Sequence, residues 1–151
     1  MGSLLSADGG AVRIPLTSNR HDYGTPQVLF DTLDAEFHFT LDPCASPENA
    51  KCKKFYTYHD NGLVQDWSGE VVFMNPPFGR DIRLWMAKAY REALNGITVV
   101  CLIPARTDTY YWHEYAMKGE IRYIRGRITF EGMKHNAPFP SAIVIFRGLG
   151  L

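Results

Sequence analysis

The apolar stretch from Ile97 to Ile103 constrains the fold more than any other feature of the sequence. Only Thr98 interrupts it, and a strand that is apolar on both faces must be covered on both faces, as in sheets with helical crossovers. A second apolar stretch, Val71–Met74, comes earlier, and residues 81–94 between the two place apolar side chains on one helical face. This order of strand, helix and strand predicts an α/β fold with a mostly parallel sheet.

The remaining elements are predicted from apolar periodicity and turn residues. They are a helix beginning at Thr25-Pro26, with Thr25 as its N-cap, and ending near Phe37; short strands at 38–41 and 55–58; a polar helical stretch at 47–54; a helix capped by Asp108 that runs to about Met117; and strands at 121–125, 127–130 and 141–146. The short connections between the last strands indicate an antiparallel C-terminal edge. Residues 1–20 are expected to form a flexible arm before one domain at 21–147.

The composition excludes some classes of protein. The chain has 151 residues, of which 46% are hydrophobic and 21% charged, as in one soluble globular domain. Its 16 Lys and Arg balance its 16 Asp and Glu, so it does not coat nucleic acid by net charge alone. Residues 1–50 are acidic, and the compensating positive charge lies in residues 51–151, where a local basic face can form.

The cysteines and the missing targeting segments indicate the compartment. Three cysteines, no secretion signal and no apolar segment of membrane-spanning length indicate a reducing compartment, so a cytoplasmic protein is expected. Cys44, Cys52 and His59 fit no standard zinc spacing, and no metal is expected. The motifs of P-loop NTPases, dinucleotide-binding folds, zinc proteases, α/β-hydrolases and zinc deaminases are also missing from the sequence.

Three turns are predicted at the carboxyl ends of strands, where ligands bind in open α/β sheets: Asp42–Ser46, Asn75–Phe78 and Pro104–Asp108. The turn Asn75-Pro-Pro-Phe78 carries the strongest chemical signal. Its prolines restrict the backbone, so the Asn75 side-chain oxygen and the Pro76 carbonyl can accept both hydrogens of one exocyclic amine. Phe78 can stack on the planar group that bears this amine. The alternative interpretation is a rigid turn with Phe78 in the core.

This turn resembles the fourth motif of AdoMet-dependent amino-methyltransferases, N/D/S-P-P-Y/F/W. A larger ordered set of motifs resembles the phage DNA N6-adenine methyltransferase (Dam-type) family over about residues 21–146. The set is Thr25-Pro-Gln-Val-Leu-Phe-Asp31, Leu41-Asp-Pro-Cys-Ala-Ser46, Asp60-Asn-Gly-Leu63, Gln65-Asp-Trp67, Asn75-Pro-Pro-Phe-Gly79, Pro104-Ala-Arg-Thr-Asp108 and Ala137-Pro-Phe-Pro-Ser141. The resemblance implies a compact Rossmann-like methyltransferase fold, the cofactor AdoMet, and methyl transfer to adenine N6 in DNA.

The resemblance also implies a role for each matching residue. The implied catalytic turn is Asn75, Pro76, Pro77 and Phe78. The residues implied in cofactor binding are Tyr23, Thr25, Pro26, Asp42, Pro43, Cys44, Ala45, Ser46, Asp60, Asp66 and Trp67. Other interpretations stay open: Thr25 as only a helix cap, Asp66 as a solvated turn residue, and Trp67 as part of the core.

The sequence has no insertion large enough for a separate target-recognition domain. Base readout is therefore expected from the loops near 104–112 and 131–140, from a homodimer, or from a partner chain. Candidate phosphate contacts are Arg80, Arg83, Arg106, Arg122, Arg125, Arg127 and Lys134, each of which is alternatively an ordinary solvated side chain. The segment from Asp42 to Asn75 is short, which is expected to leave the adenine side of the cofactor pocket open.

The leading hypothesis is an AdoMet-dependent DNA adenine-N6 methyltransferase of phage or prophage origin, with site-specific or relaxed specificity. Its substrate is a flipped adenine in duplex DNA or a base in single-stranded DNA. Two alternatives stay open. One is a methyltransferase of RNA or of a protein glutamine amide, and the other is a catalytically silent module that binds AdoMet or nucleic acid.

Overall fold

The computed structural model of the chain describes residues 23–148. The arm expected at residues 1–20 lies outside this range. In chain order the elements are α1 (Gln27–Phe37), β1 (Leu41–Asp42), β2 (Lys54–Phe55), the 3-10 helix η2 (Gly62–Val64), β3 (Val72–Met74), α2 (Ile82–Leu94), β4 (Val99–Pro104), α3 (Tyr110–Glu114), the 3-10 helix η3 (Ala116–Lys118), β5 (Glu120–Tyr123) and β6 (Ser141–Phe146).

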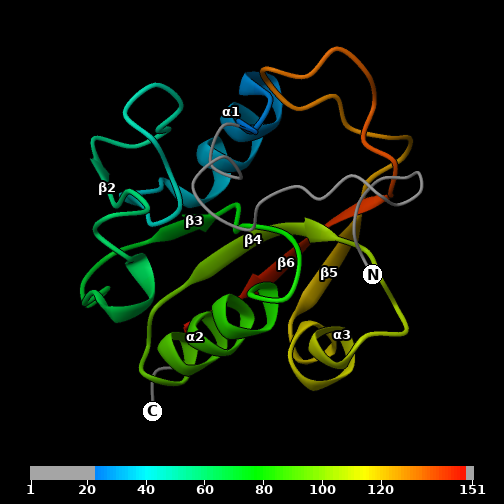
Figure 1. Cartoon of the computed structure of the whole chain (residues 1–151). Coiled ribbons are helices and arrows are strands. Elements are labelled where there is room, and N and C mark those ends of the chain that lie inside the picture. The colour runs from blue at the N-terminus through cyan, green and yellow to red at the C-terminus, as the bar shows by residue number, and fades with distance from the viewer. Residues whose placement is uncertain (1–22, 149–151) are drawn as a thin grey trace.

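The described strands form one six-stranded sheet in the order β2-β1-β3-β4-β6-β5 (Figure 1). β1 lies parallel to both β2 and β3, and β3 lies parallel to β4. β6 runs antiparallel to both of its neighbours, β4 and β5. The predicted α/β fold, with a mostly parallel sheet and an antiparallel C-terminal edge, is confirmed.

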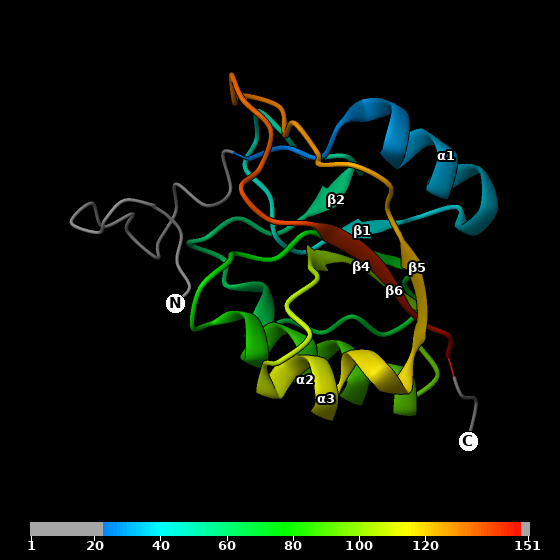
Figure 2. The ribbon, with the colours of Figure 1, turned by 90° about the vertical axis from the view of Figure 1, so that its right-hand side faces the viewer.

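Helices cover the two faces of the sheet, as Figure 2 shows: α1 lies on one face, and α2 and α3 lie on the other. β4 supplies both layers of the core because successive side chains of a strand point to opposite faces. Val99, Cys101 and Ile103 pack in the layer that contains α2 and α3, whereas Val100 and Leu102 pack in the layer that contains α1. The nearly unbroken apolar sequence of this strand is thus explained by burial on both sides.

The helix α2 forms where the apolar periodicity predicts it. Ile82, Trp85, Met86 and Ala89 are buried against the sheet, and this spacing keeps them on one helical face. The helix stops at Asn95, and Gly96 follows with a φ of +96°, a conformation that glycine adopts without steric cost. α2 therefore connects the parallel strands β3 and β4 across one face.

Two helix caps differ from the prediction. Pro26, not Thr25, occupies the N-cap position of α1, because the Thr25 hydroxyl accepts a hydrogen bond from Asn75 instead. α3 is capped by Thr109 rather than Asp108, since the Thr109 hydroxyl accepts a hydrogen bond from the backbone N–H of Trp112. Helical structure also stops at Glu114 and resumes as η3, instead of running unbroken to about residue 117.

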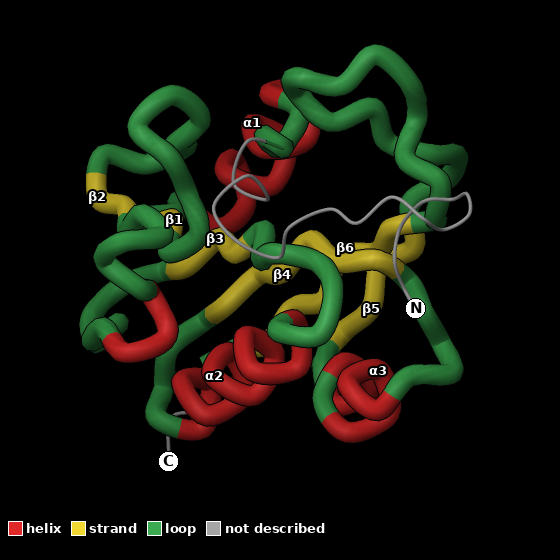
Figure 3. Tube along the Cα trace, viewed as in Figure 1, coloured by secondary structure: helices red, strands yellow, loops and turns green. Residues whose placement is uncertain are grey.

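Three short predicted elements are wrong or displaced. Residues 47–54, expected to be helical, form turns that lead into β2, because this polar segment has no apolar face to bury. The strand expected at 38–41 is reduced to Leu41–Asp42, since His38 ends α1 in the left-handed conformation. Residues 127–130 belong to a long loop between β5 and β6, at the top of Figure 3, and only Glu131 next to them forms a β-bridge, with Gly24.

Residues 23–148 contain neither a membrane-spanning helix nor a cluster of metal-binding side chains. No helix in this part of the chain is both long and apolar enough to cross a membrane. In the same range, no group of three or more His, Cys, Asp or Glu side chains is placed to hold a metal ion together.

Candidate active site

Two of the predicted turns meet at the carboxyl edge of the sheet because β1 and β3 are parallel neighbours. The turn after β1 begins at Asp42, and the turn after β3 begins at Asn75. Together with the segment before α1, they line a small, partly open cavity of about 10 Å³, which holds about one water molecule. Its lining residues are Tyr23, Gly24, Thr25, Asp42, Cys44, Asn49, Lys51 and Asn75.

The side-chain amide of Asn75 has a defined orientation. Its Nδ2 donates to the backbone carbonyl of Tyr23 and to Oγ1 of Thr25, both at 3.1 Å. Thr25 is itself buried at the start of the segment that leads into α1. The Tyr23 carbonyl can only accept, so an amide rotated by 180° would lose this hydrogen bond, and the contact places Oδ1 on the opposite side as an acceptor.

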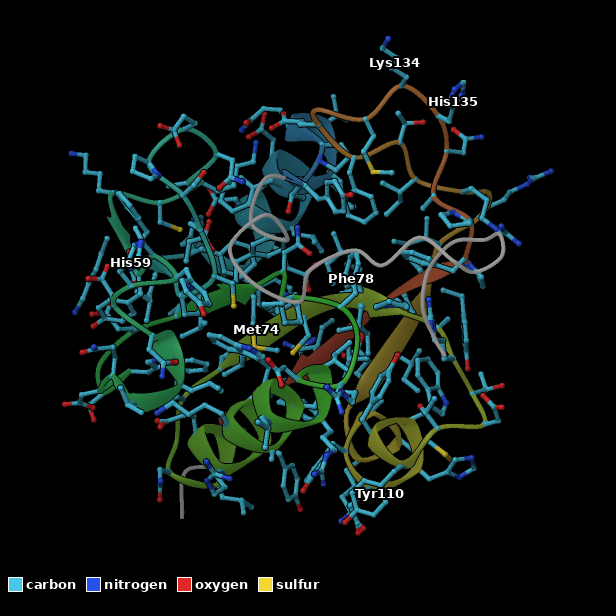
Figure 4. The ribbon with its side chains drawn as sticks, in the orientation of Figure 1. His59, Met74, Phe78, Tyr110, Lys134 and His135 are labelled. Atoms are coloured by element: carbon cyan, nitrogen blue, oxygen red, sulfur yellow. The ribbon has the colours of Figure 1, made fainter. Side chains whose placement is uncertain are left out.

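The prolines of the turn are buried, and Phe78 is 9% exposed. Its ring meets Phe139 edge-on at 5.2 Å between centroids and Phe130 at 5.8 Å. Figure 4 shows Phe78 beyond the end of β3, between the two helical layers. The guanidinium of Arg106 lies over the ring of Phe139, 5.2 Å from its centroid. The turn therefore ends in an aromatic cluster with a cation at its side.

The carboxyl group of Asp42 is buried, with only 4% of the residue exposed. Oδ2 accepts a hydrogen bond from the backbone N–H of Lys51 at 3.0 Å, and Oδ1 accepts one from the N–H of Cys44 at 3.4 Å. Burial raises the pKa of Asp42 to about 6, although both hydrogen bonds and the Lys51 charge oppose this shift. A buried carboxylate at a cavity wall is well suited to bind a cationic amine.

The loop after Asp42 is held by its own hydrogen bonds and by its neighbour η2. The side chain of Asn49 accepts from the backbone N–H of Ser46 at 2.8 Å, and Ser46 Oγ accepts from the N–H of Asn49 at 3.3 Å. Pro43 packs so closely on Gly62 that a Cβ there would collide with the Pro43 carbonyl. Two local contacts thus position the backbone that lines the cavity.

A comparison with protein families identifies the group to which this site belongs. A family model described as DNA N-6-adenine-methyltransferase (Dam) matches residues 15–147. The chain belongs to the Dam family. The resemblance inferred from the ordered motifs is therefore confirmed, and the compact α/β architecture agrees with it.

Two relatives of this Dam-family chain cover different shares of it. The DNA N-6-adenine-methyltransferase of Escherichia phage T1 is 29% identical over 110 residues, which make up 71% of this chain and 46% of that protein. YfdM, a candidate methyltransferase of Escherichia coli (strain K12), is 38% identical over 61 residues, 36% of this chain and 67% of its own length. This chain therefore spans less than half the length of its phage T1 relative.

Seven implied cofactor residues of the Dam-family chain are not among those that line the cavity: Pro26, Pro43, Ala45, Ser46, Asp60, Asp66 and Trp67. Asp60 and Asp66 are exposed, and each accepts hydrogen bonds within its own turn, from Thr57 and from Ser68 respectively. The indole of Trp67 is fully buried and donates from Nε1 to the Gly62 carbonyl at 3.0 Å. In this arrangement Asp66 is a solvated turn residue and Trp67 belongs to the core, as the alternative interpretations had it.

The candidate phosphate contacts separate into two groups. Exposed side chains occur at Arg80, Arg83, Arg125, Arg127 and Lys134, and Lys134 points outward at the tip of the β5–β6 loop (Figure 4). Arg122 differs, because its guanidinium binds both carboxylate oxygens of Glu36, at 2.7 and 2.9 Å, and also Glu120 at 2.8 Å. Arg122 therefore joins α1 to β5 through ion pairs, and its guanidinium is not free to bind a phosphate group.

Residue-based reasoning missed three residues that line the cavity of the Dam-family chain: Gly24, Asn49 and Lys51. None lies in a motif with a recognisable spacing, so no local signal pointed to them. The structure also leaves the buried hydroxyl of Ser141, beside the end of β4, without a hydrogen-bond partner among the described residues. Such a group is detectable only once the strands are placed.

Proposed function

We propose that this protein is an AdoMet-dependent DNA methyltransferase that acts on adenine N6. The observation that carries the proposal is the tethered amide of Asn75, whose Nδ2 donates to Tyr23 and Thr25. An exocyclic amine needs two acceptors to bind both of its hydrogens, and the orientation of this amide leaves its oxygen available as one of them. Membership of the Dam family supports the same reaction.

The turn would activate the amine through hydrogen bonds. Oδ1 of Asn75 and the carbonyl of Pro76 each accept one amine hydrogen, which localises the nitrogen lone pair that is otherwise delocalised into the ring. Both acceptors are rigidly placed, so they stabilise the positive charge that develops on the nitrogen without reorganisation. AdoMet supplies an electrophilic methyl group. Phe78 packs in the core against Phe130 and Phe139, so a base stacks on its ring only when this aromatic cluster opens.

The cavity residues fit the amino-acid end of AdoMet. The buried Asp42 carboxylate provides a partner for its ammonium group, and the hydrogen-bonded segment from Tyr23 to Pro26 closes over the cavity beside Asn75. We assign Pro43, Cys44, Ala45 and Ser46 to the wall next to Asp42. Because the cavity holds about one water, cofactor entry requires part of this wall to move.

We infer that DNA approaches the carboxyl edge of the sheet. An adenine must be flipped or already unpaired to reach Asn75. The exposed side chains of Arg80, Arg83, Arg125, Arg127 and Lys134, together with Arg106, are the proposed phosphate contacts. We assign base readout to the loops near 104–112 and 131–140, and a second copy or a partner chain would supply further contacts. We expect the reaction to take place in the cytoplasm of a bacterial host.

The decisive experiment measures the product directly. The protein and its Asn75→Ala variant are incubated with AdoMet and unmethylated DNA, and N6-methyladenine is quantified by mass spectrometry after digestion to nucleosides. We expect Asn75→Ala to lower the rate by about 10²- to 10³-fold, as for other lost transition-state hydrogen bonds, with a much smaller change in AdoMet affinity. Asn95→Ala, at the exposed end of α2, is the matched control and should retain activity.

Each alternative outcome has a defined meaning. Equal losses of rate and AdoMet affinity in Asn75→Ala would contradict the role assigned to the amide. No product from the parent protein, with AdoMet binding intact, would contradict the DNA substrate. The same assay would then be repeated with RNA and with glutamine-containing peptides.

A further inference from the structure

Lys51 places a buried ammonium group at the wall of the cavity. Its side chain is only 7% exposed, and its Nζ donates to Gln27 Oε1 and to Glu131 Oε1, both at 2.9 Å. An ammonium has three N–H donors, so one donor remains after these two contacts among the described residues. Lys51 lines the same cavity as Asn75 and Asp42, which makes it the nearest defined cation of the site.

Glu131, the anionic partner of Lys51, belongs to the long β5–β6 loop. Its backbone forms both hydrogen bonds of a β-bridge with Gly24, at 3.2 and 2.8 Å. Its carboxylate lies against Gly24, where a Cβ would be 2.8 Å from Oε1. Gly24 and Lys51 both line the cavity, so the loop is joined to one wall by the β-bridge at Gly24 and to another by the Lys51–Glu131 ion pair.

Asp42 and Lys51 together present both charges that an α-amino acid requires. The backbone N–H of Lys51 binds the Asp42 carboxylate, so the two side chains leave adjacent parts of one wall. An amino-acid zwitterion carries its ammonium and its carboxylate on one carbon, and charged hydrogen bonds at a partly buried site are stronger than those on an open surface. Glu131 already supplies a carboxylate to the Lys51 ammonium, as a bound amino acid would.

We propose that Lys51 binds the α-carboxylate of the cofactor's amino-acid end, and that Glu131 competes with it for the same ammonium group. This inference rests on the proposed function only in taking AdoMet as the ligand. Binding of the cofactor weakens the Lys51–Glu131 contact and so releases the side-chain link between the β5–β6 loop and Lys51, while the backbone β-bridge at Gly24 stays in place. That loop carries Arg125, Arg127 and Lys134, so cofactor binding and the DNA-facing loop are linked through one ion pair.

The test compares AdoMet with its decarboxylated analogue, in which a hydrogen replaces the α-carboxylate, by isothermal titration calorimetry. The parent protein should bind the analogue about 10- to 100-fold more weakly, the usual loss when a charge-assisted hydrogen bond is removed. Lys51→Met has a side chain of similar length without charge, and it should bind AdoMet and the analogue with nearly equal affinity. The matched control is Lys53→Met, an exposed lysine two residues along, which should keep the full preference.

Glu131→Gln tests the competition separately. Loss of the competing carboxylate should raise AdoMet affinity by about three- to tenfold and leave the affinity for the decarboxylated analogue unchanged. Thermal unfolding of each variant, followed by circular dichroism, shows that the fold is retained. If Lys51→Met unfolds, Glu131→Gln still decides the question, since its expected gain in affinity cannot come from a damaged fold.

The outcomes separate this inference from the proposed function. If Lys51→Met retains the preference of the parent for AdoMet, or if Glu131→Gln binds AdoMet more weakly, the carboxylate site is overturned and the catalytic turn is unaffected. If the preference depends on Lys51 but DNA is not methylated, the proposed substrate is overturned and the carboxylate site stands. If the parent protein does not bind AdoMet at all, both are overturned.

Discussion

At the scale of single residues, the site depends on side chains whose partners come from distant parts of the chain. Asn75 is oriented by Tyr23 and Thr25, which precede it by about fifty residues. Thr25 shows that such a contact can override the local preference of threonine for a helix cap. Its hydroxyl accepts from Asn75, and Pro26 takes the N-cap position of α1.

Asp42 leads to a prediction about pH. Its pKa of about 6 lies above the ordinary 3.8, so the folded protein favours the protonated form. The raised pKa stabilises the folded state fully below about pH 4, and this contribution is lost as the pH rises through 6. The free energy of unfolding then falls by about 3 kcal/mol. An ammonium group bound beside the carboxylate favours its ionised form and offsets this cost.

We therefore expect AdoMet affinity to fall by up to about tenfold per pH unit below pH 6, since the carboxylate must lose a proton to bind the ammonium. Calorimetry between pH 5 and pH 7 measures this dependence. The isosteric Asp42→Asn variant should bind AdoMet with a nearly constant affinity over the same range. An unchanged slope in that variant would remove Asp42 from the binding of the ammonium group.

At the scale of elements, contacts between loops position the site. The turn after β1 rests on η2 through Pro43 and Gly62, and the indole Nε1 of Trp67 donates to the Gly62 carbonyl. The β5–β6 loop reaches the segment before α1 through Glu131 and Gly24. Trp67, implied by family resemblance to contact the cofactor, stabilises this loop packing from within the core.

Gly62→Ala should lower the free energy of unfolding by about 1–3 kcal/mol, because its methyl group would meet the Pro43 carbonyl and the edge of the Trp85 ring. Chemical denaturation monitored by tryptophan fluorescence measures the change. Val64→Ala provides the control within the same 3-10 helix, since Val64 is 73% exposed and its truncation should cost less than about 0.5 kcal/mol. Equal stabilities of the two variants would show that η2 does not support the turn.

At the scale of the whole molecule, some basic side chains are neutralised by ion pairs and others are exposed to solvent. Glu36 and Glu120 bind Arg122, and Arg147 also binds Glu120, so these charges cancel where α1 meets β5. Within residues 23–148, the exposed arginines and Lys134 of the proposed DNA-binding surface form no ion pair with a carboxylate. A neutral chain can therefore carry a local basic face.

This distribution predicts different effects for two classes of arginine. Arg127→Ala should weaken DNA binding at low salt and reduce the slope of log affinity against log salt by about one unit, the effect of one lost phosphate contact. Fluorescence anisotropy with labelled DNA, measured over a salt series, gives this slope. Arg122→Ala should leave the slope unchanged and instead lower thermal stability. A reduced slope in Arg122→Ala would restore that residue to the DNA-binding surface.

The sequence by itself determined the parallel core, the antiparallel edge, the helix α2 and the turn at Asn75. These features depend on local periodicity and on proline and glycine chemistry, which act within a few residues. The tertiary structure alone decided the orientation of the Asn75 amide, the burial of Asp42 and Trp67, and the presence of Lys51 at the cavity. Each of these depends on groups brought together by parallel strands and long loops, and no spacing in the sequence encodes such distances.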